Sequence, residues 1–350
     1  MANFVYFLLH TVKPVLTRVV IGAVIAVMLA AAVVIATTVS SDDNEGVLLS
    51  PMRNDIKKLS LDPDKFLREF NYGKVSTLPD GTTLREFTII AEDIEIEVAP
   101  GIFFNAWSYN GTVPGPTIRV TEGDRVKITF INHSQHSHTI HLHGIHPAEM
   151  DGVFEIVGSG GRIVYEFTAE PFGLFLYHCH VPPVAEHINR GLYGAFIVDP
   201  KTPRPPADEM VMIMNGFDTD FDEENNFYAV NGPAFYFMKN PIKIKTDQLI
   251  RVYLINILEF DQINSLHIHG NMYKLYRTGT SLTNYEITDM VTMSQGERAV
   301  LEFTYKYPGR YMFHAHQNEF ADKGWMGVFD VVEDLDADGN GYQNSSKGHM

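Results

Sequence analysis

The chain contains very little cysteine, with one in 350 residues, at position 179. A single cysteine cannot form a disulfide within the chain. Basic residues are also scarce, since 27 Lys and Arg stand against 43 Asp and Glu, which gives a formal net charge of −16. A protein that binds a phosphate backbone needs a basic face, so nucleic acid is excluded as a partner.

Long apolar runs are rare, and one segment stands out. Val19 to Val39 has no charged residue and is long enough to span a bilayer. Lys13 and Arg18 precede it and acidic residues follow it, so its N-terminal end should face the cytoplasm. We expect an uncleaved transmembrane helix, with a cleaved signal peptide as the alternative. The prediction is a single-pass protein of the cell membrane whose catalytic domains are extracytoplasmic.

Length and composition suit two domains with substantial cores, because 45% of the residues are apolar. Residues 42–80 are polar, with a possible short helix near Phe66 to Phe70. The tail contains Asp334, Asp336 and Asp338, which resembles the start of a calcium loop that lacks its last acidic ligand, so a disordered tail is favoured and calcium binding is the alternative. The predicted parts are a cytoplasmic segment 1–18, a transmembrane anchor 19–39, a linker 40–82, a first domain 83–200, a second domain 207–333 and a polar tail 334–350.

Short alternating runs begin near Thr83 and are separated by turn formers such as Pro114-Gly115-Pro116. Alternation with period two at this spacing predicts an all-β fold made of antiparallel sandwiches or barrels. The pattern then repeats: His141-Leu-His143-Gly is echoed by His267-Ile-His269-Gly, 126 residues later. Two copies of one β-domain in tandem are therefore expected.

Eight of the 15 histidines fall in four His-x-His pairs, at 141/143, 178/180, 267/269 and 314/316. Successive side chains of a strand point to opposite faces. In His178-Cys179-His180 the two imidazoles therefore share one face and the sulfur points to the other. By the same parity His138 points away from His141 and His143, so it can meet Cys179.

A thiolate with two imidazoles is typical of a blue-copper electron-transfer site. We predict His187, eight residues after Cys179, as the second imidazole. The axial position falls near Leu192, which offers no donor and so predicts a raised reduction potential. Met150 is an alternative axial ligand.

The second domain lacks this site, because Asn264 stands where His138 is expected and Ala315 replaces Cys179. It keeps both histidine pairs. The two domains together offer eight paired imidazoles, which is too many for one metal and suits a cluster of three between the domains.

With Asn110-Gly-Thr-Val-Pro-Gly-Pro116 and all four His-x-His pairs, the chain resembles the two-domain multicopper oxidases of the laccase type, a cupredoxin family, over about residues 85–333. The resemblance implies two tandem cupredoxin-like sandwiches, a homotrimer, dioxygen as oxidant and about four copper ions per chain. It implies a type 1 copper at His138, Cys179 and His187, near which the substrate gives up electrons, and a type 2 copper at His141 and His267. It also implies Asp151 as a proton relay, and a type 3 pair at His143, His178, His180, His269, His314 and His316.

Two alternatives remain open. The related copper nitrite reductases share the tandem domains, but usually hold one type 2 copper with three imidazoles and place an aspartate where His141 stands. A non-catalytic copper carrier is the other. The reducing substrate, whether a phenol, an aromatic amine or a metal ion, stays undetermined. Met210, Met212 and Met214 alternate along one strand, which favours a sulfur-lined core over a Cu(I) docking site.

Overall fold

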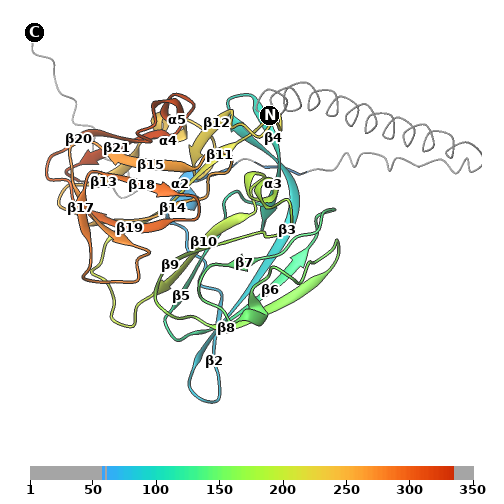
Figure 1. Cartoon of the computed structure of the whole chain (residues 1–350). Helices are drawn as coiled ribbons and strands as arrows, with labels where there is room; N and C mark the ends of the chain where they lie inside the picture. The colour runs from blue at the N-terminus through green and yellow to red at the C-terminus, as the bar shows by residue number, and fades with distance from the viewer. Residues whose placement is uncertain (1–56, 60, 335–350) are drawn as a thin grey trace, which may run out of the picture. The chain divides into compact units, whose positions relative to one another are not determined.

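The structure is a computed structural model that describes residues 57–59 and 61–334. This part of the chain is made of β-strands with few helices, which confirms the expected all-β fold (Figure 1). The helices are α2 (Pro63–Arg68), the 3-10 helix η1 (Ala148–Met150), α3 (Val184–Asn189), α4 (Tyr236–Lys239) and α5 (Asn318–Asp322).

The N-terminal sandwich consists of two sheets. Every second side chain is buried in β6 (Arg125–Asn132), whereas all side chains of β9 (Gly173–His178) are buried. The first sheet contains β1 (Lys57–Leu59), β2 (Lys74–Thr77), β3 (Thr83–Ala99), β4 (Ile102–Tyr109), β6 (Arg125–Asn132) and β8 (Arg162–Thr168). The second contains β5 (Gly115–Thr121), β7 (His141–Leu142), β9 (Gly173–His178) and β10 (Tyr193–Asp199).

The C-terminal sandwich repeats this plan with two further sheets (yellow to red in Figure 1). One contains β11 (Asp208–Phe217), β12 (Phe227–Val230), β14 (Ile250–Asn256), β16 (Tyr273–Arg277), β17 (Glu286–Thr288) and β19 (Arg298–Phe303). The other contains β13 (Ile242–Lys245), β15 (Ile263–Ile268), β18 (Met290–Ser294), β20 (Gly309–His314) and β21 (Met326–Val332).

The sheets are mixed, so the expectation of purely antiparallel sandwiches was wrong. β3 pairs with β6, and β5 with β10, in parallel. The C-terminal sandwich repeats these pairings with β11–β14 and β13–β21. Parallel neighbours need a crossover connection, and here the chain passes through the opposite sheet between them. Alternation along one strand does not report the direction of its neighbour.

Three apolar clusters hold the molecule together. One fills each sandwich, and the third joins residues of both, such as Leu176 of β9 and Val211 of β11. The methionines at 210, 212 and 214 are at most 1% exposed and belong to the core of the C-terminal sandwich, which confirms the sulfur-lined core.

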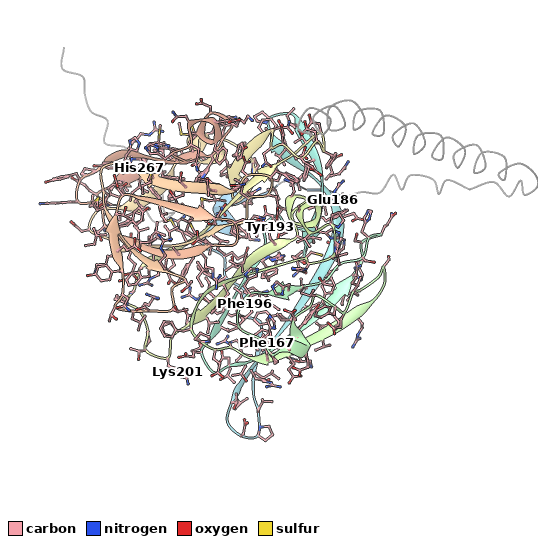
Figure 2. The ribbon with its side chains drawn as sticks, in the orientation of Figure 1. Phe167, Glu186, Tyr193, Phe196, Lys201 and His267 are labelled. Carbon is pink, nitrogen blue, oxygen red and sulfur yellow. The ribbon has the colours of Figure 1, made fainter. Side chains whose placement is uncertain are left out.

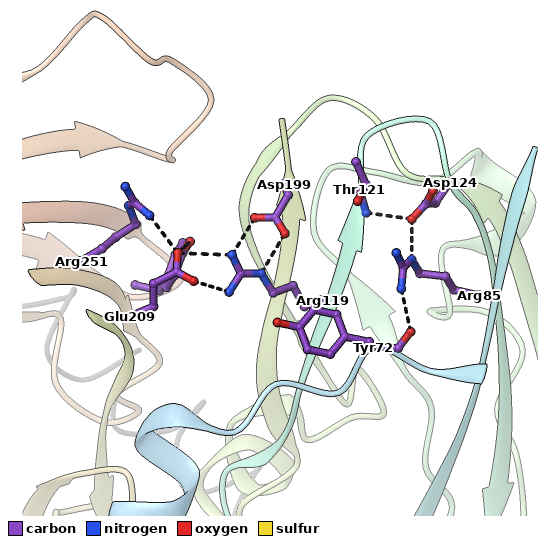
Figure 3. A network of polar contacts seen from close by, with 9 residues as sticks. Tyr72, Arg85, Arg119, Thr121, Asp124, Asp199, Glu209 and Arg251 are labelled. Atoms are coloured by element: carbon purple, nitrogen blue, oxygen red, sulfur yellow. Dashed lines mark hydrogen bonds and ion pairs between the residues drawn. The ribbon is translucent and has the colours of Figure 1, made fainter. Parts of the chain in front are cut away.

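A chain of ion pairs crosses from one sandwich to the other (Figure 3). Arg119 on β5 binds Asp199 and Glu209 through two nitrogen–oxygen contacts each, between 2.6 and 3.2 Å. Glu209 in turn accepts from Arg251 at 2.9 Å. These mostly buried charges are stable only while the two sandwiches keep this arrangement, because moving any one of the paired residues away would leave an unpaired charge out of contact with water. The network therefore fixes how the two sandwiches meet.

The segment before Thr83 packs on both sandwiches. Leu67 of α2 is fully buried in the core of the C-terminal sandwich, and Arg68 binds Asp208. Asn71 exchanges backbone hydrogen bonds with Thr117 and Arg119. The short helix expected here is present, and residues 61–82 are part of the folded unit.

Several predictions fall outside the described residues. The transmembrane segment Val19 to Val39 and most of the polar tail lie there. Within residues 57–59 and 61–334, no helix is both long and apolar enough to cross a membrane. The domain limits 83–200 and 207–333 stay a prediction.

Candidate metal centres

His138, Cys179 and His187 meet in the N-terminal sandwich. The sulfur of Cys179 lies 3.2 Å from Nδ1 of His187 and 3.9 Å from Nδ1 of His138, and the two nitrogens are 3.2 Å apart. His138 forms an isolated β-bridge with Val157, Cys179 directly follows β9, and His187 lies on α3. All are buried, His187 the least at 5% exposure. The strand parity that placed His138 beside Cys179 therefore holds.

Neighbouring groups orient these ligand atoms. Nε2 of His138 bonds Ser134 Oγ at 2.9 Å, which leaves Nδ1 to face the sulfur. The Thr139 amide donates to the sulfur at 3.4 Å. The His138 ring is thus fixed by one nitrogen and presents the other toward the buried sulfur of Cys179. This arrangement matches the donor set of a thiolate–imidazole copper site.

Leu192 is tied to two of these residues through the backbone. The Cys179 amide donates to its carbonyl at 3.0 Å, and its own amide donates to His187 at 3.2 Å. Its side chain is fully buried in the same core as Cys179. The Met150 sulfur instead accepts from the Glu166 amide at 3.3 Å. The surroundings thus favour Leu192 over Met150 beside the sulfur.

His141, His143 and His178 form a second cluster on the other face of the same strands. His141 of β7 stands opposite His178 of β9 in the ladder. Nε2 of His143 lies 2.9 Å from Nε2 of His178. The ring of His180 lies 5.2 Å from that of His141, but its nitrogens are not among the three that converge.

The outer nitrogens of these rings are engaged by oxygens. Nδ1 of His178 bonds the Cys179 carbonyl at 2.8 Å, and Nδ1 of His141 bonds the Asp151 carbonyl at 2.8 Å. Nε2 of His178 is then left without a proton and points at His143. Two imidazole nitrogens this close need a shared proton or a cation, so the arrangement fits a bound metal.

The C-terminal sandwich repeats this cluster with His267, His269 and His314. His267 stands opposite His314, and Nε2 of His269 lies 3.1 Å from Nε2 of His314. Nδ1 of His314 bonds the Ala315 carbonyl, as His178 bonds that of Cys179. His269 and His316 are exposed, and His267 and His269 line an open hollow.

The position of the sulfur site is filled differently in this sandwich. Ala315 is fully buried, and the Asn264 side chain accepts from the Trp325 indole at 3.1 Å. Trp325 follows Gly324 as Leu192 follows Gly191 in the repeat. A large ring and a neutral amide therefore stand at the positions of Leu192 and His138, and this copy lacks the thiolate–imidazole donor set.

Burial lowers the pKa of four histidines of the N-terminal sandwich, and neighbouring imidazoles lower it further. The pKa falls to about 3 for His138 and His143. It falls to about 4 for His178 and His187. These rings are neutral at neutral pH, which keeps a lone pair available for a metal. Burial raises the pKa of the Cys179 thiol, so metal binding has to displace its proton.

We expect metal-free protein to lose stability as the pH falls from about 6.5 to about 4. Above pH 6.5 the rings are neutral in both folded and unfolded states. Below pH 6.5 the histidines of the unfolded chain bind protons, whereas those of the folded state bind them only near their lower pKa values of about 3 and 4. This difference favours the unfolded state as the pH falls. Thermal unfolding of metal-free protein between pH 8 and 4 measures the slope.

His138→Asn should make the stability of the metal-free protein depend less on pH, because it removes one ring with a lowered pKa. Asparagine is chosen because Asn264 stands at the corresponding position of the second domain. His133→Asn changes an exposed ring and should leave this pH dependence as in the wild type. An equal slope in His138→Asn protein would contradict the assignment of the buried neutral ring.

The two halves of the histidine set do not meet within one chain. Within residues 57–59 and 61–334, no group of three converging ligand atoms combines histidines of both sandwiches. Figure 2 labels His267 of the C-terminal cluster and, in the N-terminal sandwich, Glu186 of α3 beside the sulfur site. His143 does border the C-terminal sandwich, since a Cβ on Gly296 would lie 3.7 Å from its ring.

The structure adds residues that the sequence did not single out. The Trp107 ring lies 5.1 Å from the ring of His138 and 4.7 Å from that of His187. The Asp289 carbonyl accepts from His267 at 2.9 Å, as that of Asp151 does from His141. Asp289 follows its histidine by 22 residues and Asp151 by 10, so the repeat does not align them.

Asp151 lies beside the first histidine cluster, and its role as a proton relay stays a prediction. Its carboxylate is 3.1 Å from Nδ1 of His141 and 3.5 Å from Nε2 of His146. The ring of exposed His136 lies 4.6 Å from the Trp107 ring and is tilted by 40° to it, whereas no such ring contact is found for His133 among the described residues.

Known proteins resemble this chain over both sandwiches. Two family models, both described as multicopper oxidase, match residues 92–203 and 203–334. A crystal structure of a multicopper oxidase is 55% identical, with a TM-score of 0.77, and the match covers 78% of this chain and 97% of that one. A copper nitrite reductase from Nitrosomonas europaea is 28% identical, with a TM-score of 0.67 and coverage of 72% and 95%.

Among curated proteins, a probable nitrite reductase-hydroxylamine oxidoreductase fusion protein of Kuenenia stuttgartiensis is 32% identical over 273 residues. The match covers 69% of this chain and 31% of that protein. The chain spans less than two thirds of the length of the first curated relatives that it matches. Because the two family models together extend over residues 92–334, which include every clustered histidine, the chain belongs to the multicopper oxidase family.

Proposed function

We propose that the protein couples one-electron oxidation of a small reducing substrate to the four-electron reduction of dioxygen to water. The observation that supports this most is the facing pair of imidazole nitrogens that recurs in both sandwiches, at 2.9 and 3.1 Å. A site for one metal uses about three or four ligands, whereas the two sandwiches offer eight imidazoles.

Each cluster has its own role in this proposal. Bound copper supplies the one-electron chemistry and the dioxygen binding that no side chain provides. His138, Cys179 and His187 would hold type 1 copper, and His141 and His267 type 2 copper. The type 3 pair would be held by His143, His178, His180, His269, His314 and His316.

The chain offers a short electron route between the two faces of β9. The Cys179 backbone joins the sulfur to both adjacent histidines. The hydrogen bond of 2.8 Å from His178 Nδ1 to the Cys179 carbonyl adds a second link. Electrons that enter at the sulfur site would leave through His178 and His180.

Asp151 is the proposed proton relay. Its carboxylate touches His141, and 29% of its side chain is exposed, so it joins solvent to the cluster. Each dioxygen takes four protons with four electrons, which makes proton delivery a requirement of the reaction. Asp151→Asn would keep the backbone bond to His141 and remove the carboxylate.

The cluster would be completed by a second chain. Each half lies partly exposed on its own sandwich, and the halves do not converge within one chain. A rotationally symmetric ring can bring the N-terminal sandwich of one subunit to the C-terminal sandwich of the next. We propose a homotrimer, as the family resemblance implies.

We also propose that the protein is anchored in the cell membrane, with the copper sites outside the cytoplasm. The support is the uncharged segment Val19 to Val39 and the charges on either side of it. Carbonate washing of membranes from expressing cells should leave the full chain in the pellet. Release into the supernatant would argue for cleavage.

Nitrite reduction to nitric oxide is the second candidate. It is favoured by the similarity to the copper nitrite reductase of Nitrosomonas europaea and to the fusion protein of Kuenenia stuttgartiensis. It is disfavoured by His141, where those enzymes usually place an aspartate, and by the full second pair His314 and His316.

Copper content separates the candidates. Fully loaded protein should contain about four copper ions per chain by mass spectrometry, and Cys179→Ser about three. About two would indicate a nitrite reductase, and about one a simple carrier. Oxygen uptake with a generic reductant, and nitric oxide formation from nitrite without oxygen, are the paired activity measurements.

Replacing Leu192 by methionine should lower the reduction potential of the sulfur site. A thioether adds a weak axial donor that stabilises the oxidised metal. Anaerobic redox titration of the blue absorbance measures the change, with Leu174→Met, another fully buried leucine, as the control. An unchanged potential would mean that position 192 is not axial.

A further inference from the structure

His187 is the ligand nearest to solvent in the sulfur site, yet it is only 5% exposed. A reductant therefore has little direct contact with it. The Trp107 indole covers it at 4.7 Å and also lies 5.1 Å from His138. Trp107 itself is 7% exposed, so electrons have to enter through the residues outside its ring, which include exposed His136 at 4.6 Å and Arg190 at 4.8 Å.

Trp107, Arg190 and Phe221 form a stack next to the sulfur site. The central carbon of the Arg190 guanidinium lies 4.8 Å from the centroid of the Trp107 ring and 4.3 Å from that of the Phe221 ring. The Phe221 ring also stacks on Phe104, with 5.8 Å between the centroids. The Trp107 amide donates to the Arg190 carbonyl at 2.9 Å, which fixes the inner pair. Phe221 is 48% exposed and forms the outer surface of the stack.

Phe221 reaches this place from the other sandwich, on the loop between β11 and β12. Its φ of 60° is a rare conformation for a bulky residue. Asp218, 2% exposed, accepts the amides of Asp222 and Glu223 and so holds the loop in shape. A conformation of this cost persists where its surroundings enforce it, often at functional positions.

The surroundings of Phe221 are negatively charged. Arg190 is offset by Glu186, whose carboxylate accepts from it at 3.0 Å. The exposed neighbours of Phe221 on its loop are Asp220, Asp222, Glu223 and Glu224. Arg190 and Phe104 pack on the Phe221 ring, and the part of the ring that stays exposed lies beside these carboxylates, which attract a cation with an aromatic surface of its own.

From this geometry we infer that Phe221, Arg190 and Trp107 form the electron-entry port, and that its substrate is a positively charged aromatic reductant such as a protonated aromatic diamine. The inference rests on the proposed function for the identity of the electron acceptor. The reductant loses one electron and becomes its oxidised radical. That electron passes through the stack to the metal held by His187 and Cys179, and no bond forms or breaks at the port.

Binding can be measured without copper. In metal-free full-length protein, phenyltrimethylammonium should quench tryptophan fluorescence saturably, because Trp107 lies under the port while Trp325 is 1% exposed in the other sandwich. Benzenesulfonate, its anionic counterpart, should not. Phe221→Ala should weaken the cation's binding by about tenfold, and Phe221→Trp should retain it.

Tyr307→Ala is the control, since Tyr307 is an exposed aromatic residue of the same sandwich outside the stack. It should bind the cation as the wild type does. Equal binding of cation and anion, or wild-type binding by Phe221→Ala, would overturn the inference.

Electron entry is measured by anaerobic bleaching of the blue absorbance in copper-loaded protein. A cationic ferrocene should reduce the wild type about tenfold faster than ferrocenecarboxylate at low salt, after correction for driving force, and the ratio should shrink as salt is added. Phe221→Ala should slow the cationic reductant severalfold at an unchanged potential. Equal rates for both reductants would contradict the port.

The proposed function and the electron-entry port can be refuted separately. Protein without blue absorbance, or without oxygen uptake, would refute the proposed function and leave the fluorescence result standing. A normal oxidase in which Phe221→Ala changes neither binding nor electron entry would refute only the port.

Discussion

Cys179→Ser protein is expected to lose the blue absorbance and to slow with every reductant by at least about 1000-fold. The sulfur is the one soft donor between His138 and His187, and the backbone of Cys179 is the link to His178. A serine oxygen in this buried place cannot replace the thiolate that gives the copper its colour and potential.

The repeat provides a matched control for this change. Ala315 is the counterpart of Cys179, and it is equally buried. Ala315→Ser puts the same hydroxyl into the C-terminal sandwich and should keep the blue absorbance. Turnover retained in Cys179→Ser protein would show that electrons bypass the sulfur.

The second large effect concerns chains that complement one another. A variant with His141 and His143 changed to Ala and one with His267 and His269 changed to Ala should each be inactive. Trimers formed from an equal mixture of the two should regain about a quarter of wild-type activity. In every mixed trimer one of the three junctions brings an intact N-terminal sandwich to an intact C-terminal one, and about three quarters of random trimers are mixed.

The mixture has to be refolded or co-expressed, so that subunits exchange, and its copper content should rise with its activity. Mixing the two variants after separate assembly is the control and should give no gain. If the cluster formed within one chain, no combination would restore activity, because every chain would lack one half.

The sequence predicts the sites well where a single strand carries the information. Parity along His178, Cys179 and His180 separates the two metal sites, and the ladder then sets His141 opposite His178. His187 was predicted from its distance along the chain, and the turn of α3 brings it back to the sulfur.

Features that depend on distant segments are not visible in the sequence. Trp107 and Phe221 come from β4 and from a loop of the other sandwich, and no spacing relates either to the ligands. Parallel pairing of β3 with β6 follows from the path of the chain between them. The separation of the two histidine sets depends on how the sandwiches dock, which the buried ion pairs around Arg119 determine.

The stoichiometry of oxygen consumption tests the central claim most directly. With copper-loaded protein and a one-electron reductant, the account predicts four reductant molecules oxidised for each dioxygen consumed, without hydrogen peroxide, and no nitric oxide when nitrite replaces oxygen. A ratio of two with peroxide released, or nitrite-dependent formation of nitric oxide without oxygen uptake, would contradict it.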